Sequence, residues 1–114
     1  MLESRFQAML IKEIKKLLPN AMVFKMDPTY IQGTPDLLIL YKKKWAMLEC
    51  KKGADSAHRP NQDYYIRLLN AMSFARFICP ENKKEVLDDM VRSLKGFSAK
   101  RTRIIQPKPT SMDE

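Results

Sequence analysis

The stretch from Leu37 to Tyr41 is the longest unbroken run of aliphatic or aromatic residues in the chain. Five such residues without polar alternation are typical of a short β-strand covered on both faces, and they are far too few to span a bilayer. Three lysines, Lys42, Lys43 and Lys44, form a charged turn after it, and a second strand-like segment runs from Trp45 to Lys51. The two segments are therefore predicted to pair as a hairpin.

Helical patterning appears on both sides of this hairpin. Apolar residues recur at spacings of four, four and three from Phe6 to Leu17, which predicts a helix that ends before Pro19. A second helix is expected to begin at Pro60 and to run to about Ser73. The remaining predicted elements are strands at 22–26 and 74–79 and a last helix from 80 to about 96.

This order of elements predicts an α/β fold, a small mixed β-sheet flanked by helices. We expect residues 1–96 to form one domain and residues 97–114 to form a basic C-terminal tail. The composition agrees, because 45% hydrophobic and 30% charged residues are ordinary values for a globular protein. These values exclude a disordered chain, a fibrous repeat and a coiled coil.

The chain is strongly basic, with 21 Lys and Arg against 13 Asp and Glu and a formal net charge of +8. Such a surface attracts phosphate polymers through counterion release. A surface that only keeps the protein in solution is the alternative.

No segment is predicted to direct the protein out of the cytoplasm or into a membrane. Residue 3 is the acidic Glu3, whereas the start of a secretion signal is positively charged, and no long apolar segment follows it. We therefore expect Cys50 and Cys79 to be reduced and buried, and neither has a His or Cys neighbour at metal-ligand spacing.

The most informative pattern is Gly33-Thr34-Pro35-Asp36, then twelve residues, then Glu49-Cys50-Lys51. Side chains alternate along a strand, so Glu49 and Lys51 point to one face and Cys50 to the other. If the hairpin forms, Asp36 can lie close to Glu49. Two nearby carboxylates repel each other, and a bound divalent cation such as Mg²⁺ is the simplest way to offset this repulsion. Metal-bound water is easier to deprotonate, and the metal offsets charge that builds up on a phosphate.

Glu3 lies near the centre of the apolar stripe of the first predicted helix. An acid on a core-facing side is costly unless it has a partner. It either stabilises the first turn through the helix dipole or joins the other two carboxylates.

Pro35-Asp36 and Glu49-Cys50-Lys51 together resemble the signature of the PD-(D/E)XK nuclease superfamily. The glycine two residues before the proline, the aliphatic run after Asp36 and the early glutamine of the next helix, Gln62, make the chain similar to the VRR-NUC family. The resemblance spans about residues 3–94 and implies a restriction-endonuclease-like core.

The resemblance also implies roles for individual residues. Asp36, Glu49 and the backbone carbonyl of Cys50 would be ligands of Mg²⁺ or Mn²⁺, and Lys51 would be the catalytic lysine. Glu3 matches a helix acid that sometimes assists the metal. Gln62 would help to hold the site or approach the scissile phosphate; a plain polar residue in a first helical turn is the alternative.

Basic and aromatic residues complete the set of predicted DNA contacts. Tyr30, Tyr64 and Tyr65 can stack on unpaired bases, although core packing explains at least one of them better. The predicted contacts to the DNA backbone, each of which can instead be a solvated surface residue, are Lys42, Lys43, Lys44, Lys52, Arg59, Lys100, Arg101 and Arg103.

These features predict a metal-dependent endonuclease that hydrolyses DNA phosphodiester bonds. The resemblance implies a homodimer that acts on branched DNA, such as a Holliday junction or a flap, and a phage-like protein in a bacterial cytoplasm. Two alternatives stay open, a non-catalytic nucleic-acid-binding or interaction module on the same fold and a sequence-specific nuclease of the restriction type.

Overall fold

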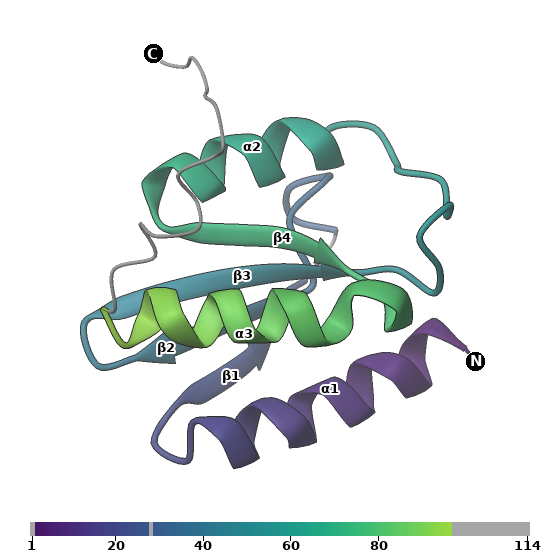
Figure 1. The fold of residues 1–114 in the computed structure, drawn as a ribbon. Coiled ribbons are helices and arrows are strands. Elements are labelled where there is room, and N and C mark those ends of the chain that lie inside the picture. The colour runs from purple at the N-terminus through teal and green to yellow at the C-terminus, as the bar shows by residue number, and fades with distance from the viewer. Residues whose placement is uncertain (1, 28, 97–114) are drawn as a thin grey trace.

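The computed structural model describes residues 2–27 and 29–96 and shows a small mixed α/β fold (Figure 1). The order of helices and strands is the predicted one, and the hairpin is confirmed. The elements are α1 (Glu3–Leu17), β1 (Met22–Lys25), β2 (Leu37–Tyr41), β3 (Lys44–Cys50), α2 (Gln62–Met72), β4 (Phe74–Ile78), the 3₁₀ turn η1 (Pro80–Asn82) and α3 (Lys83–Leu94).

The four strands form one sheet in the order β1-β2-β3-β4. β2 is antiparallel to both β1 and β3, whereas β4 is parallel to β3 and is reached through α2. The register pairs Leu37 with Leu48 and Tyr41 with Lys44. The closed end of the hairpin is therefore at Lys42 and Lys43, and the residues next to Leu37 and Leu48 lie at its open end.

The hydrophobic core lies between one face of the sheet and the helices α1 and α3, which Figure 1 shows side by side. Phe6, Leu10 and Ile14 of α1 are buried in it, as the spacing predicts. Leu17 is exposed instead, and Leu18 is fully buried because the chain leaves the helix there and turns towards the sheet. None of the helices in the described ranges has both the length and the apolar character needed to cross a bilayer.

Both cysteines are free and buried, as expected. Cys50 belongs to the core of the sheet. Burial raises the pKa of the Cys50 thiol well above its ordinary value, and the nearby Asp36 and Glu49 act in the same direction.

The prediction that β2 is covered on both faces is wrong. Leu37 and Ile39 are buried, whereas Leu38 is half-buried and Leu40 is exposed. The reason is that α2 packs mainly on β4 and leaves β1 and β2 open on that side. We call this region the open sheet face; it consists of Met22 and Phe24 of β1, Leu38 and Leu40 of β2 and Trp45 of β3.

The β1–β2 loop is fixed at its base and at its far end. The Met26 backbone N–H donates to the Asp36 carbonyl at 2.8 Å, which closes the base. Gly33 has φ +94°, and a Cβ on it would lie 2.8 Å from the Cβ of Asn61. Glycine therefore lets the loop contact the chain just before α2, where a larger residue in this left-handed conformation is strained.

We predict that Gly33→Ala lowers the free energy of unfolding by about 1–3 kcal/mol, through both the positive φ and the contact with Asn61. Gly53→Ala is the matched control, since a Cβ there meets only ordinary contacts at 3.5 Å or more. Denaturant unfolding monitored by circular dichroism measures both variants. Equal stability of the two would contradict the close approach of the loop.

Candidate active site

Asp36 and Glu49 meet at the open end of the hairpin. Asp36 immediately precedes β2, and Glu49 follows the Leu48 that pairs with Leu37, so the register places the two acids opposite each other. The Cys50 backbone N–H donates to Asp36 Oδ2 at 2.9 Å and fixes this carboxylate against β3. The hairpin therefore brings the two predicted acids together, as expected.

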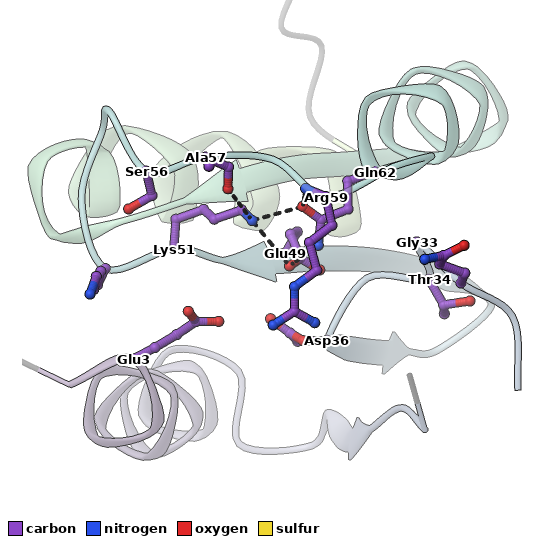
Figure 2. A pocket seen from close by; sticks show the side chains of 12 residues that line it. Glu3, Gly33, Thr34, Asp36, Glu49, Lys51, Ser56, Ala57, Arg59 and Gln62 are labelled. Carbon is purple, nitrogen blue, oxygen red and sulfur yellow. Dashed lines mark hydrogen bonds and ion pairs between the residues drawn. The ribbon is translucent and has the colours of Figure 1, made fainter. Parts of the chain in front are cut away.

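Glu3 completes a cluster of three carboxylates. Glu3, Asp36 and Glu49 each offer one carboxylate oxygen, and these oxygens all lie within 4.8 Å of one another. Figure 2 shows Glu3 reaching from α1 towards Asp36 and Glu49. Glu3 also occupies the first turn of α1, where the helix dipole favours an anion, so the two readings of this residue are compatible.

Glu49 is the most constrained of the three acids, with only 3% of its surface exposed. Its Oε2 accepts a hydrogen bond from Gln62 Nε2 at 2.7 Å, whereas its Oε1 is buried without a hydrogen-bond partner among the described residues. Burial and the neighbouring Asp36 raise the pKa of Glu49 to about 7. Burial also raises the pKa of Asp36, although the Cys50 N–H opposes this shift.

Lys51 lies on the same face as Glu49, as strand alternation predicts, and it is buried. Its Nζ is 3.9 Å from Glu49 Oε2 and donates hydrogen bonds to Gln62 Oε1 at 2.7 Å and to the Ala57 carbonyl at 3.0 Å (Figure 2). The contribution of Ala57 was not predicted, because a backbone carbonyl leaves no signature in the sequence.

Gln62 holds the charged groups in their relative positions. Its amide donates to Glu49 and accepts from Lys51, and its Oε1 also accepts from the Arg59 backbone N–H at 2.8 Å. Because Gln62 is buried at the start of α2, it links the first turn of this helix to the end of β3. Gln62 therefore connects Glu49 and Lys51 through hydrogen bonds, and its predicted role in the site stays a prediction.

These side chains border a pocket of about 340 Å³. Arg59 is exposed, and Figure 2 shows its guanidinium directed towards Asp36. Its charge lowers the pKa of Asp36 and so partly offsets the effect of burial. The residues that line the pocket are Glu3, Gln32, Gly33, Thr34, Asp36, Glu49, Lys51, Lys52, Ser56, Ala57, Arg59 and Gln62.

The predicted DNA contacts fall into three groups. Lys52 and Arg59 line the pocket beside the acids. Lys42, Lys43 and Lys44 lie at the closed end of the hairpin, separated from Glu49 by the length of β3, roughly 20 Å. This separation follows from the hairpin itself, because Asp36 and Glu49 lie at its open end and the three lysines at its closed end. The tail residues Lys100, Arg101 and Arg103 lie outside the described part of the chain.

The donor set fits a hard divalent cation. Mg²⁺ and Mn²⁺ prefer oxygen ligands, and three carboxylates offer them here, from α1, from the residue before β2 and from β3. The unpartnered Glu49 Oε1 supplies an acceptor that nothing in the described structure satisfies. The Cys50 N–H points to Asp36, and in an extended strand the carbonyl of the same residue points the same way, as the predicted ligand role requires.

We predict that the stability of the metal-free protein falls as pH rises. Between pH 4.5 and about 7, folded Glu49 retains a proton that the unfolded chain has released, so the free energy of unfolding decreases across this window. Mg²⁺ or Mn²⁺ should offset the repulsion and raise the Tm by about 4 °C or more at about pH 8, with little effect at about pH 5. Differential scanning fluorimetry measures this shift.

Two variants separate Glu49 from other acids in this test. Glu49→Gln should remove most of the metal-dependent shift, whereas Glu85→Gln, which changes an exposed acid on α3, should keep it. If Mg²⁺ and Mn²⁺ leave the Tm of the unmodified protein unchanged at about pH 8, the result would contradict a cation site here.

A scan against protein-family models finds no match for the chain, and searches of curated proteins and of solved structures find no significant neighbour. The chemical interpretation of the pocket therefore rests on the geometry of its own side chains.

Proposed function

We propose that the protein is a metal-dependent endonuclease that hydrolyses DNA phosphodiester bonds on a restriction-endonuclease-like core. The observation that carries this proposal is the buried, unpartnered Glu49 Oε1 within a three-carboxylate cluster, next to an equally buried Lys51. Burying Glu49 beside the half-buried Asp36 costs stability, and a function that uses the cluster explains why the chain keeps this arrangement.

Glu3, Asp36, Glu49 and the Cys50 carbonyl would hold Mg²⁺ or Mn²⁺. When bound, such a cation makes its water easier to deprotonate and neutralises charge on a phosphate. Lys51, held by Gln62 and Ala57, supplies a fixed positive charge for the negative charge that develops on the phosphate oxygens.

Lys52 and Arg59 are suited to bind the substrate at the rim of the pocket. Both line the pocket and both are exposed, so they can contact phosphates without loss of packing. Phosphate contacts of this kind position a nucleic acid but read no sequence. The rim therefore supports a structure-selective nuclease acting on junctions or flaps more than a sequence-specific one.

A non-catalytic nucleic-acid-binding module on the same fold is the second candidate. The net charge of +8 favours it as much as it favours the enzyme. The carboxylate cluster does not, because three acids facing the bound phosphates weaken binding unless a cation lies between them.

The open sheet face supports the homodimer that we include in the proposal. Tyr64, Leu68 and Met72 form an exposed stripe along α2, and Asn70 on the opposite side of the helix bonds the Ala75 backbone of β4. The stripe therefore faces away from the outer edge of β4 and towards β1 and β2. Ser73, the C-cap of α2, donates to the Trp45 carbonyl, so this end of the stripe lies next to the open sheet face.

Together these surfaces are large for a monomer. Six of their side chains, on β1, β2 and α2, expose between 37% and 65% of their area. They supply on the order of 600 Å² of apolar surface, close to the roughly 800 Å² per partner that stable complexes bury. Two copies related by a two-fold axis would cover this area with one another and present two active sites.

Cleavage assays test the proposed activity directly. In Mg²⁺ or Mn²⁺, the protein should cut labelled flap or four-way junction DNA, and Lys51→Ala should lower the rate by at least about 100-fold because it removes a charge that acts on the developing negative charge. Lys12→Ala, an exposed lysine on α1, makes the same change in net charge and should leave the rate unchanged.

The alternatives give different results in the same assay. Tight DNA binding without cleavage in either metal would overturn the nuclease and favour the binding module. Cleavage confined to one sequence in linear duplex would favour a restriction-type enzyme.

Light scattering after size-exclusion chromatography tests the dimer. Phe24→Asp should convert dimers to monomers without unfolding the protein. Residue 24 is partly exposed in the monomer, so the new carboxylate would be buried without a partner only in the dimer. Met9→Asp, a comparably exposed apolar position on α1, is the control and should remain dimeric. A monomeric unmodified protein would contradict the interface.

A further inference from the structure

The loop between β1 and β2 presents an aromatic side chain that nothing in the described structure packs. Tyr30 is 84% exposed, more than any other large hydrophobic residue described, and the adjacent Ile31 is exposed as well. Tyr30 lies two residues before Gln32, the first of three consecutive loop residues that line the pocket. The aromatic ring is therefore carried at the border of the proposed active site.

The loop is ordered by its own hydrogen bonds. Asp27 Oδ1 accepts from the backbone N–H of Thr29 at 2.9 Å and from its hydroxyl at 2.7 Å, and these bonds lower the pKa of Asp27. On the other side of Tyr30, the Thr34 hydroxyl donates to the Ile31 carbonyl at 2.8 Å. Together with Gly33 against Asn61, these bonds restrain the described backbone on either side of Tyr30.

The two sides of the pocket differ in chemistry. Figure 2 shows Gly33 and Thr34 on one side of Asp36, and Lys51 and Ser56 on the other. The loop carries the acids Asp27 and Asp36 and no Lys or Arg, whereas the segment that follows β3 contributes Lys52 and Arg59. The loop therefore offers no cation to a phosphate, and its exposed apolar groups are the ring of Tyr30 and the side chain of Ile31.

A single nucleic-acid strand has the same two-sided character, with phosphates along one side and bases along the other. If its phosphate lies over the carboxylates and is held by Lys52 and Arg59, its bases lie towards the loop. Aromatic side chains beside a basic groove bind unpaired bases by stacking. In a continuous duplex the bases are already stacked and paired, so Tyr30 has no base to contact.

We propose that Tyr30 stacks on an unpaired base next to the phosphate held in the pocket, and so selects DNA with unpaired nucleotides at that position over continuous duplex. This inference rests on the proposed function for the location of the phosphate and adds the feature of the substrate that is recognised. Ile31 extends the apolar surface next to the ring.

The test is DNA binding in Ca²⁺, which places a cation between the carboxylates and the phosphate, and a denaturing gel verifies that the probe stays uncut. One probe is a duplex with a splayed single-stranded arm whose first unpaired base is 2-aminopurine, which loses fluorescence when it stacks on an aromatic ring. The other is the same sequence fully paired. The variants are Tyr30→Ala, Tyr30→Leu and Tyr30→Phe, which are expected to fold because the side chain is exposed.

The unmodified protein and Tyr30→Phe should quench the splayed probe and bind it more tightly than the duplex. Tyr30→Ala and Tyr30→Leu should lose the quenching and bind the splayed probe roughly tenfold more weakly, with duplex binding unchanged. Quenching and affinity that survive in Tyr30→Ala would overturn the proposal, as would an equal loss of affinity for both probes.

This outcome is independent of the nuclease test. Metal-dependent cleavage together with unaltered binding by Tyr30→Ala would leave the proposed function standing and remove base stacking. Stacking that depends on Tyr30, in a protein that cuts no DNA in Mg²⁺ or Mn²⁺, would support base stacking and overturn the nuclease.

Discussion

The buried amide of Gln62 is the contact on which the geometry of the pocket depends. It donates to Glu49, accepts from Lys51, and accepts from the backbone of Arg59. Glu49 and Lys51 form an ion pair at 3.9 Å, and the amide bridges the same two groups by hydrogen bonds. These contacts use Glu49 Oε2, so that Oε1 remains without a hydrogen-bond partner among the described residues.

Strand alternation and hairpin pairing were enough to predict the centre of the site. Glu49 and Lys51 share a face, Cys50 points into the core, and Asp36 lies opposite Glu49, all of which follow from local periodicity and one turn. Helical spacing likewise located α1, and with it Glu3. These relations depend on backbone geometry that is the same in any hairpin or helix.

The features that were not predicted depend on how elements pack against one another. The open side of β2 arises because α2 lies over β4, which no pattern within Leu37–Tyr41 encodes. The hydrogen bond from Lys51 to Ala57 involves a backbone carbonyl in an irregular segment, where any residue type would serve.

The three carboxylates come from parts of the chain that are far apart in sequence: the first turn of α1, the residue before β2 and the C-terminal end of β3. The site is therefore a set of long-range contacts and cannot exist in a partly folded chain. Glu3 sits almost at the start of the helix, where few backbone bonds restrain it. Repulsion from the sheet would favour fraying of that first turn, whereas a bound cation would fasten the N-terminal helix to the middle of the sheet. The order of the first turn of α1 would then depend on whether the three carboxylates hold a cation.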